Sequence, residues 1–268
     1  MLTPWRSQVR ILCRPFHTNN VTASAPKVAL ITGGGTGVGR STTLQLADRG
    51  LHVAINYSRS QDDAEATAMA AREKGVRAIT IGCDVSSDSQ VVQMVERCRA
   101  EFGRLDVLVN NAGTTFFVEH SDLASMTEEK WDKILAVNLK GPFFVSRAAI
   151  PLLRASGGGS IVNVASVAGV AGSGSSIAYA ASKGGLITLT KSLAKAFAPD
   201  IRANAVCPGP IVSRWLEDHQ DMVQAAIKVT PLKRASTTDD IADVVTFLAC
   251  DAGMMTGQAL VVDGGRTM

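Results

Sequence analysis

The sequence predicts an α/β protein, built as a single doubly wound parallel sheet of about seven strands with helices on both faces. Three observations lead to this prediction. Short apolar, β-branched segments alternate with helix-like segments; the first of them, residues 27–32, runs directly into a glycine-rich turn; and residues 155–182 contain no charged side chain. Alternation of this kind implies parallel strands joined by right-handed helical crossovers.

The order of the elements follows from the hydrophobic periodicity. Strands are expected near residues 27–32, 51–56, 76–81, 105–109, 161–165, 201–206 and 259–262, and helices near 40–49, 61–74, 87–102, 127–153, 178–197 and 238–250. The stretch 210–232 is longer and less regular, which is typical of a functional lid or a surface excursion. We therefore predict one catalytic domain over residues 26–268 that carries a substrate loop at 210–232.

Composition and charge narrow the class of function. The 268 residues are 46% hydrophobic, which is enough for one large domain, and outside residues 1–25 the basic and acidic residues balance at 24 each. A neutral body offers no footprint for nucleic acid. The five cysteines form no C-x-x-C pair and the four histidines are scattered, so we expect reduced thiols and no metal site. In residues 155–182, glycine and serine fill 13 of 28 positions, which is too interrupted for a membrane helix.

Residues 1–25 form a separate extension in this interpretation. Apolar side chains fall on one helical stripe, three arginines fall on another, and the segment contains no acid. An amphipathic, arginine-rich, acid-free start is typical of a mitochondrial presequence. We predict a targeting-like extension and a location in the mitochondrial matrix; a disordered tail and a cytoplasmic location are the alternatives.

A glycine turn separates the first strand from the first helix. Glycines permit close backbone approach, and a helix N-terminus offers unpaired N–H groups to a pyrophosphate. The run from Gly34 to Ser41 nearly spells a P-loop, but Arg40 stands where that motif requires lysine, which favours a dinucleotide. The expected contacts are Gly33, Thr36, Gly37, Val38 and Gly39.

Tyr179 and Lys183 lie four residues apart on a predicted helix and therefore share a face. An ammonium beside the phenol favours the phenolate and brings the tyrosine pKa toward neutral. Ser166 lies thirteen positions upstream and offers a hydroxyl for a carbonyl oxygen. A Tyr/Lys pair also occurs by chance in many helices, but a pair that opens a helix after a buried strand stands where an open α/β sheet places its site.

Together these residues resemble the short-chain dehydrogenase/reductase family from about residue 27 to the C-terminus. No single motif is specific, and the resemblance rests on their joint order and spacing: Thr32-Gly33-x-x-x-Gly37-x-Gly39, Asn110-Asn111-Ala112-Gly113, Asn138, Ser166, Tyr179-x-x-x-Lys183, Pro208-Gly209 and the closing stretch Thr256 to Gly265. The resemblance implies a Rossmann-type sheet and an oxidoreductase that moves a hydride between a nicotinamide and a carbonyl or alcohol.

The resemblance also implies a role for each residue. Tyr179 would protonate the substrate oxygen, Lys183 would lower the tyrosine pKa and bond the nicotinamide ribose, and Ser166 would hold the carbonyl oxygen. Asn138 would position a water that relays protons to solvent, with a simple helix cap as the alternative. The further cofactor contacts would be Asp84, Val85, Asn111, Ala112, Gly113, Pro208, Gly209 and Ser213.

Two departures from the family pattern bear on the substrate side. Ser213 replaces the threonine that commonly meets the nicotinamide carboxamide, which preserves a hydroxyl. The family's 3-oxoacyl-carrier-protein reductases hold an acidic carrier with basic residues at the rim of the active site, whereas the corresponding stretches here are 157–159 and 199–200, with Arg154 close by. A small-molecule carbonyl or alcohol is the predicted substrate. The departure makes a carrier-protein substrate less favoured, but the nearby Arg154 leaves that alternative open.

The end of the second strand predicts the cofactor. An acid there accepts hydrogen bonds from the adenosine ribose in NAD-binding sheets. This chain has Tyr57 at that position, followed by Ser58 and Arg59, which offer a hydroxyl and a charge-assisted contact to a 2′-phosphate. The sequence predicts NADP(H). The alternatives are an NAD-dependent alcohol dehydrogenase of the same family and a catalytically idle dinucleotide-binding scaffold.

Two sets of apolar side chains are expected to form contacts beyond the cofactor and catalytic residues. The long helices carry more apolar surface than one sheet face requires and, with the family habit, predict a homotetramer through Phe143, Phe144, Leu186, Leu189, Leu193 and Phe197. A second set is expected either in a substrate pocket or in plain packing: Phe116, Phe117, Val167, Ala168, Trp215 and Met222.

Overall fold

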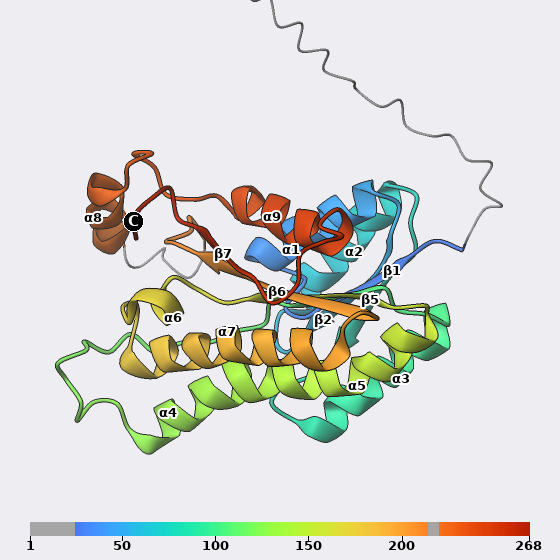
Figure 1. Ribbon diagram of the computed structural model, residues 1–268, viewed down its shortest axis with the longest axis horizontal. Helices are drawn as coiled ribbons and strands as arrows, with labels where there is room; N and C mark the ends of the chain where they lie inside the picture. The colour runs from blue at the N-terminus through green and yellow to red at the C-terminus, as the bar shows by residue number, and fades with distance from the viewer. Residues whose placement is uncertain (1–24, 214–219) are drawn as a thin grey trace, which may run out of the picture.

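A computed structural model describes residues 25–213 and 220–268 and contains one parallel sheet of seven strands (Figure 1). In sheet order β3-β2-β1-β4-β5-β6-β7, the strands are Ala78–Gly82, His52–Tyr57, Val28–Ile31, Val107–Asn110, Gly159–Val164, Ile201–Pro208 and Ala259–Val262. The predicted fold class is confirmed. The strand order reverses between β1 and β4, which opens a crevice at the carboxyl ends of these strands. Of the predicted extension, residues 1–24 lie outside the described residues.

Helices cover both faces of the sheet. Alternate residues of β1 pack on opposite sides: Ala29 and Ile31 join one apolar cluster, and Val28 and Leu30 join the other. The first cluster is covered by α1 (Gly37–Asp48), α2 (Gln61–Glu73) and α9 (Thr238–Cys250), and the second by α3 (Asp88–Phe102), α5 (Gly141–Ala155) and α7 (Ile177–Phe197) (Figure 1). Burial on both faces explains why the strands are continuous apolar runs.

The predicted helix at 127–153 is interrupted by a wider turn. The structure has α4 (Glu128–Leu135), a π-helical turn η1 (Ala136–Lys140) and then α5. Pro142 has no N–H to donate to the carbonyl of Asn138 four residues earlier, which favours a local change in hydrogen bonding. The predicted site residue Asn138 lies within this π-helical turn.

The stretch 210–232 is more regular than its sequence indicates, because it contains α8 (Gln220–Val229). Val223 and Ala226, three residues apart, bury one face of this helix. A parallel bridge between Ile211 and Ser236 closes the base of the excursion. The sequence analysis did not predict this helix, because the helix is stabilised by the packing of its buried face and not by a strong local signal.

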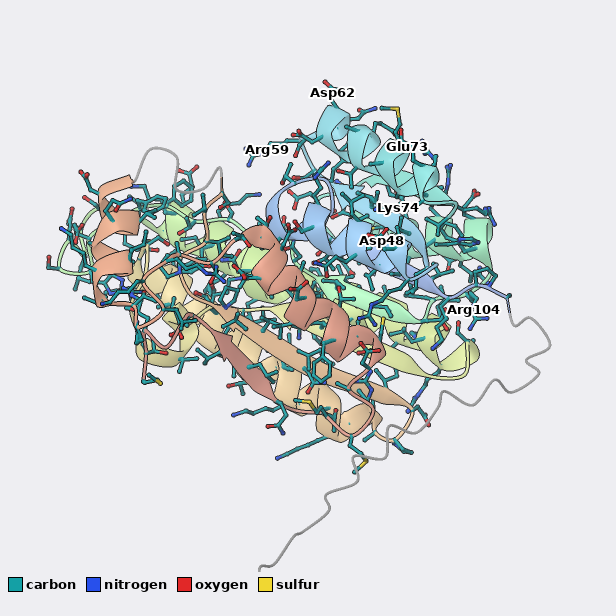
Figure 2. All side chains as sticks on the ribbon, turned by 90° about the horizontal axis from the view of Figure 1, so that it is seen from above. Asp48, Arg59, Asp62, Glu73, Lys74 and Arg104 are labelled. Atoms are coloured by element: carbon teal, nitrogen blue, oxygen red, sulfur yellow. The ribbon has the colours of Figure 1, made fainter. Side chains whose placement is uncertain are left out.

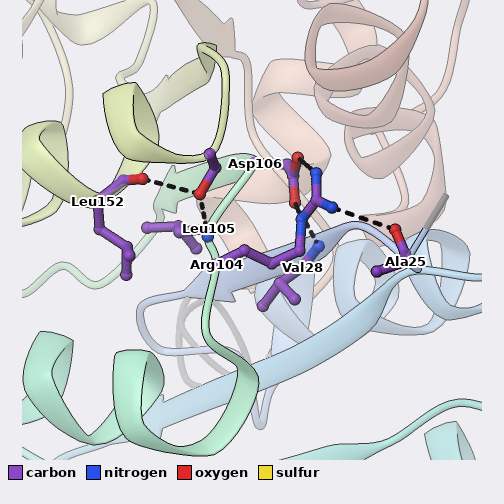
Figure 3. Close-up of polar contacts among 7 residues, drawn as sticks. Ala25, Val28, Arg104, Leu105, Asp106 and Leu152 are labelled. Carbon is purple, nitrogen blue, oxygen red and sulfur yellow. Dashed lines mark hydrogen bonds and ion pairs between the residues drawn. The ribbon is translucent and has the colours of Figure 1, made fainter.

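An ion pair between the partly exposed Arg104 and the buried Asp106 stabilises the amino edge of the sheet (Figure 3). Asp106, at the start of β4, accepts two hydrogen bonds from the Arg104 guanidinium at 2.9 and 2.7 Å and one from Val28 N at 2.8 Å. Arg104 Nη1 also donates to the carbonyl of Ala25 at 3.2 Å. This cluster holds the beginnings of β1 and β4 together.

Two further findings concern side chains and membranes. The four described cysteines form no disulfide with one another; Cys83, Cys98 and Cys207 are buried, and Cys250 is exposed. Within the described residues, the helices are too short or too polar to cross a membrane.

Candidate active site

Local structure places Tyr179 in the first turn of α7. The helix starts after Ser176, whose buried hydroxyl accepts a hydrogen bond from Tyr179 N at 3.3 Å. Serine at this position satisfies one of the unpaired N–H groups of the first turn. The loop before it contains Gly174 at φ 117°, a conformation that L side chains rarely adopt. The phenol is thereby brought to the carboxyl edge of the sheet, beside the end of β5.

The structure brings Ser166, Tyr179 and Lys183 together. Ser166 follows β5, its Oγ accepts a hydrogen bond from Ala168 N at 3.1 Å, and its hydroxyl is hydrogen-bonded to the Tyr179 phenol. Lys183 is 4% exposed. Its Nζ lies 5.6 Å from the centre of the tyrosine ring and donates to the carbonyl of Val164 at 2.8 Å.

Burial dominates the titration of the Tyr/Lys pair. Desolvation raises the pKa of the Tyr179 phenol to about 12, and the hydrogen bond with Ser166 opposes this only in part. Desolvation also lowers the pKa of Lys183 to about 8, against a smaller opposing effect of Cys207. Burial therefore shifts the pKa of the Tyr179 phenol in the direction opposite to the one expected from Lys183, whose ammonium donates to the carbonyl of Val164. The phenol is protonated at neutral pH, which suits a proton donor.

Asn138 is fully buried and holds two segments of the site together. Its Oδ1 accepts from Thr114 N at 2.8 Å, and its Nδ2 donates to Thr114 O at 2.9 Å and to Ser182 Oγ at 3.1 Å. Ser182 Oγ in turn donates to the carbonyl of Tyr179 at 2.7 Å. Both ends of the amide are thus bonded to protein, and Asn138 braces the first turn of α7. No motif in the sequence pointed to Ser182 as the residue that connects Asn138 to Tyr179.

The glycine turn presents a helix N-terminus suited to an anion. In the described part of the chain, Thr36 makes no side-chain capping bond to α1, and the first turn of α1 contains no acid. The helices α2, α3, α4 and α9 all begin with acidic residues. The unpaired N–H groups and partial positive charge at the start of α1 therefore remain available for a ligand.

Glycine packing shows that the turn also has the required shape. A Cβ on Gly39 would stand 2.1 Å from the carbonyl oxygen of Gly33, so α1 approaches β1 closely. Gly37 has φ 52°, and no described atom lies within 4 Å of the place its Cβ would take. A close approach on one side and open space on the other fit a pyrophosphate, so the residues present fit the dinucleotide.

Two polar residues at strand ends position the turn. Thr32 Oγ1 accepts from the backbone N–H groups of Asn111 and Ala112, each at 3.0 Å, and so holds the predicted segment 111–113 beside the glycines. Asn56 is 1% exposed; its Oδ1 accepts from Gly33 N at 3.3 Å, and its Nδ2 donates to the carbonyl before Asp84 at 2.9 Å. Sequence reasoning missed Asn56 as a site residue. The available signal was an amide inside an apolar, β-branched strand.

The segment at Asp84 is ordered by its own carboxylate. Asp84 Oδ1 accepts from Ser86 N at 2.9 Å and from Ser86 Oγ at 2.6 Å, and Oδ2 lies 3.4 Å from Lys133 Nζ. Burial opposes ionisation, but these partners outweigh it and lower the pKa of the carboxyl. The neighbouring Val85 is 5% exposed and packs against Gly141 of α5.

The Pro208-Gly209 turn lies next to Ser166. β6 ends at Pro208, whose carbonyl accepts from Val167 N at 3.0 Å. Gly209 N donates to the carbonyl of Val262 in β7 at 3.0 Å. Ser213 is partly exposed and is the last residue described before position 220. The turn therefore connects β5, β6 and β7 at the same edge.

β2 ends at Tyr57, beside the glycine turn, and Ser58 and Arg59 follow it in the chain. Gly34 N of the turn donates to the carbonyl of Asn56 at 3.0 Å. Ser58 and Arg59 are exposed, and no ion pair of Arg59 occurs within residues 25–213 and 220–268. Figure 2 shows Arg59 at the tip of the connection to α2, pointing away from Asp62. Its guanidinium is thus accessible at the cofactor edge of the sheet.

The predicted pocket residues do not form one set. Val167 and Ala168 are buried in the core of the protein, whereas Phe116 and Phe117 are 37% and 39% exposed. Trp215 and the side chain of Met222 lie outside what the structure describes. A separate groove on α4, η1, α5 and α7 contains none of the predicted catalytic residues. It is lined by Asp132, Leu135, Ala136, Leu139, Lys140, Phe143 and Leu189.

Comparison with known proteins identifies the family. The family model described as enoyl-(acyl carrier protein) reductase matches residues 33–267. A ketoacyl reductase of the granaticin polyketide synthase from Streptomyces violaceoruber is 42% identical over 241 residues, which cover 89% of this chain and 95% of that protein. The chain belongs to the short-chain dehydrogenase/reductase family.

Two more short-chain dehydrogenase/reductase relatives agree with the assignment. The 3-oxoacyl-[acyl-carrier-protein] reductase FabG of Staphylococcus epidermidis is 40% identical over 90% of this chain and 99% of its own length. A crystal structure described as a short-chain dehydrogenase/reductase from Burkholderia xenovorans superposes with a TM-score of 0.86 at 36% identity, covering 91% of this chain and 98% of that one. The protein is therefore an oxidoreductase of carbonyls or alcohols that binds a nicotinamide dinucleotide.

The relatives also correct one prediction. Those named above come from Streptomyces, Staphylococcus and Burkholderia, which are bacteria and have no mitochondria. The predicted mitochondrial location is therefore wrong. The prediction of a mitochondrial location came from the arginine-rich start of the chain. This start lies in residues 1–24, outside the described structure, and precedes the family match, which begins at residue 33.

Proposed function

We propose that this short-chain dehydrogenase/reductase uses NADP(H) to reduce the carbonyl of a ketone or aldehyde to an alcohol, or catalyses the reverse, with Tyr179 as the acid or base. One observation carries the proposal. A phenol that is protonated at neutral pH is hydrogen-bonded to Ser166 at the same edge of the sheet as a glycine turn that fits a pyrophosphate. The names of the relatives, which are ketoacyl and 3-oxoacyl reductases, support carbonyl reduction.

The bound cofactor supplies the hydride. The Ser166 hydroxyl holds the carbonyl oxygen, and the Tyr179 phenol gives that oxygen its proton as negative charge develops on it. Lys183 contributes a positive charge in a desolvated place, where it stabilises developing negative charge more strongly than in water. Asn138 acts as a positioning residue in this proposal, because its amide holds Thr114 and, through Ser182, the backbone of Tyr179.

The preference for NADP(H) rests on the end of β2. Tyr57 stands where an NAD site places a carboxylate, so nothing at this position repels a 2′-phosphate. Arg59 is exposed and offers a guanidinium fork, which matches phosphate geometry. The further cofactor contacts that we propose are Gly33, Thr36, Gly37, Val38, Gly39, Ser58, Asp84, Val85, Asn111, Ala112, Gly113, Lys183, Pro208, Gly209 and Ser213.

The cofactor preference is tested by kcat/KM with NADPH and with NADH. We expect the parent to favour NADPH, and the double variant Tyr57→Asp with Arg59→Ala to lower the NADPH-to-NADH ratio by about 100-fold, since one charge contact is lost and one repulsion is gained. Arg97→Ala, which removes an exposed arginine on α3, is the matched control and should leave the ratio unchanged. A parent that prefers NADH would disprove the preference.

The same assay separates an enzyme from an idle scaffold. Purified protein with NADPH is offered small ketones, aldehydes and 3-oxoacyl thioesters. Turnover of any of them supports the enzyme, and the ranking names the substrate class. Cofactor binding without turnover on the whole panel would favour the scaffold, despite the complete set Asn138, Ser166, Tyr179 and Lys183.

We also propose a single catalytic domain over residues 26–268 and a homotetramer. Phe143 on α5 is 43% exposed, and Leu189 on α7 lies in the same groove, which supports an apolar contact between chains. Leu186 and Leu193 are buried in the chain's own core and do not contribute to that surface. Light scattering at working concentration should give the mass of four chains, and a monomeric mass would contradict the tetramer.

A further inference from the structure

The last six residues of the chain, 263–268, form a hook around the side chain of Asp263, which is 7% exposed. Its Oδ1 accepts a hydrogen bond from Gly265 N at 2.8 Å, and its Oδ2 accepts from Thr267 N at 2.8 Å and from Thr267 Oγ1 at 2.7 Å. Burial opposes ionisation, but these donors outweigh it and lower the pKa of the carboxyl. One buried carboxylate therefore sets the path of the C-terminus.

One side of the hook packs on the Pro208-Gly209 turn. A Cβ on Gly209 would stand 2.8 Å from Asp263 Cβ, so the two backbones are in direct contact. The carbonyl of Pro208 accepts from the N–H of Val167, the residue after Ser166. The hook therefore packs against the Pro208-Gly209 turn, and this turn is hydrogen-bonded to Val167, the residue after the proposed catalytic Ser166.

The other side of the hook holds the residues that follow α8. Leu232 N donates to the carbonyl of Gly264 at 3.2 Å. A Cβ on Gly264 would stand 2.7 Å from Thr230 Cγ2, and one on Gly265 would stand 3.1 Å from Pro231 Cγ. Thr230 is 3% exposed, and its hydroxyl donates to a carbonyl of the last turn of α8 at 2.8 Å. The hook therefore connects the end of α8 to the Pro208-Gly209 turn.

We infer that Asp263 is a positioning residue for the proposed reaction: the hook that it closes sets the separation of α8 from the Pro208-Gly209 turn and so shapes the substrate side of the site. The inference rests on the proposed function. Figure 1 shows α8 and the short helix α6 (Ala168–Ala171), which follows Ser166, beyond the same edge of the sheet. The glycine turn, α1 and the end of β2, which we assign to the cofactor, have no bond to the hook in the described residues. Opening the hook should therefore weaken substrate binding and spare the cofactor.

Two variants open the hook to different degrees. Asp263→Asn keeps the size of the side chain but replaces one acceptor oxygen with an amide N–H₂ group. This group would face the N–H or O–H donors of the hook and could not accept their hydrogen bonds. Thr267→Val keeps the shape and removes one of the three hydrogen bonds, so it serves if the first variant fails to fold. Asp122→Asn is the matched control, because Asp122 is an exposed carboxylate that accepts from Ser125 N at 3.1 Å in a separate turn.

The experiment measures two Michaelis constants, the KM for the substrate and the KM for NADPH, and compares how each changes. We expect the substrate KM to rise about tenfold in Asp263→Asn and about threefold in Thr267→Val, with the KM for NADPH within about twofold of the parent and Asp122→Asn unchanged. Tryptic cleavage after Lys228 and Lys233, at the end of α8, should also be faster in Asp263→Asn. That second readout needs no turnover.

The outcomes separate the inference from the proposed function. If the parent is active and both hook variants keep its substrate KM, the inference alone is overturned. It is also overturned if the substrate KM and the NADPH KM rise and kcat falls by the same factor, because that would indicate general damage to the protein. A parent that turns over no carbonyl overturns the proposed function and with it the role in substrate binding. In that case unchanged tryptic cleavage in Asp263→Asn would also refute the connection to α8.

Discussion

Each of the two edges of the sheet buries a charged side chain, but in the described residues only the one at the amino edge has an ion-pair partner. At the amino edge, Asp106 is 7% exposed and is paired with Arg104 through two hydrogen bonds. At the carboxyl edge, Lys183 is 4% exposed, and its Nζ has no carboxylate within ion-pair distance among the described residues, only the carbonyl of Val164. A paired buried charge holds strands together, whereas an unpaired one with a displaced pKa marks a place for chemistry.

Removal of the reacting group at the carboxyl edge should change activity most and stability little. Tyr179→Phe deletes the phenolic hydroxyl and keeps the ring, so kcat should fall by about 1,000-fold, within the range of general acid catalysis, while the Kd for NADPH changes by less than about twofold. Steady-state kinetics and fluorescence titration of the cofactor measure both quantities. Because the charge at the amino edge is untouched, the free energy of unfolding should stay near that of the parent.

Retained activity in Tyr179→Phe would remove Tyr179 from its proposed role. Ser192→Ala, on the exposed side of the same helix, is a suitable control, since its hydroxyl bonds only a carbonyl of its own helix at 3.2 Å. That control should keep the kcat of the parent.

At the amino edge the expected effect is on stability. Asp106→Asn leaves the Arg104 guanidinium without its countercharge and should lower the free energy of unfolding by about 3 kcal/mol. The matched control is Asp200→Asn, which breaks an ion pair with Arg154 whose side chains are about half exposed, at 49% and 50%, and should cost less than about 1 kcal/mol. Urea unfolding measures both. Equal losses in the two variants would show that burial does not distinguish these pairs.

The smallest expected effect is a pH dependence at the carboxyl edge. The pKa of Lys183 is about 8 and that of Tyr179 about 12, so between pH 6 and 10 the lysine loses its proton and the phenol keeps its own. For carbonyl reduction, kcat/KM should be level up to about pH 7.5 and about tenfold lower at pH 9, since the positive charge of Lys183 is lost. Lys191→Met, which removes an exposed lysine of α7, should keep the same profile.

A loss of folding stability would not explain such a fall in kcat/KM with rising pH. The folded pKa of Lys183 is below the ordinary value of 10.5, so between pH 8 and 10.5 the unfolded chain binds more protons and this group's contribution to stability rises with pH. A level profile through pH 9.5 would contradict the proposed part of Lys183. A fall centred near pH 10 in its place would indicate that the lysine is less desolvated than its burial implies.

Much of this molecule was predictable because the signals are local. A strand, a glycine turn and a helix are adjacent in sequence, and so are the residues of the Tyr179-x-x-x-Lys183 pair. The contact of Asn138 with Ser182, the helix α8 and the hook at Asp263 were not predictable in the same way. Each depends on contacts between residues far apart in the chain, such as Asn138 with Ser182 or Leu232 with Gly264.

Helical spacing and the alternation of strands and helices are local signals, and they predict from the sequence alone that Ser166, Tyr179 and Lys183 meet at the carboxyl edge. The protonation states of these groups depend on the tertiary structure. The direction of a pKa shift depends on how completely other elements exclude water from a group, and here β5, α6 and β6 surround the pair from outside its own helix. Local spacing predicted a phenolate held by an ammonium; desolvation of both groups leaves a protonated phenol and a lysine that titrates near pH 8.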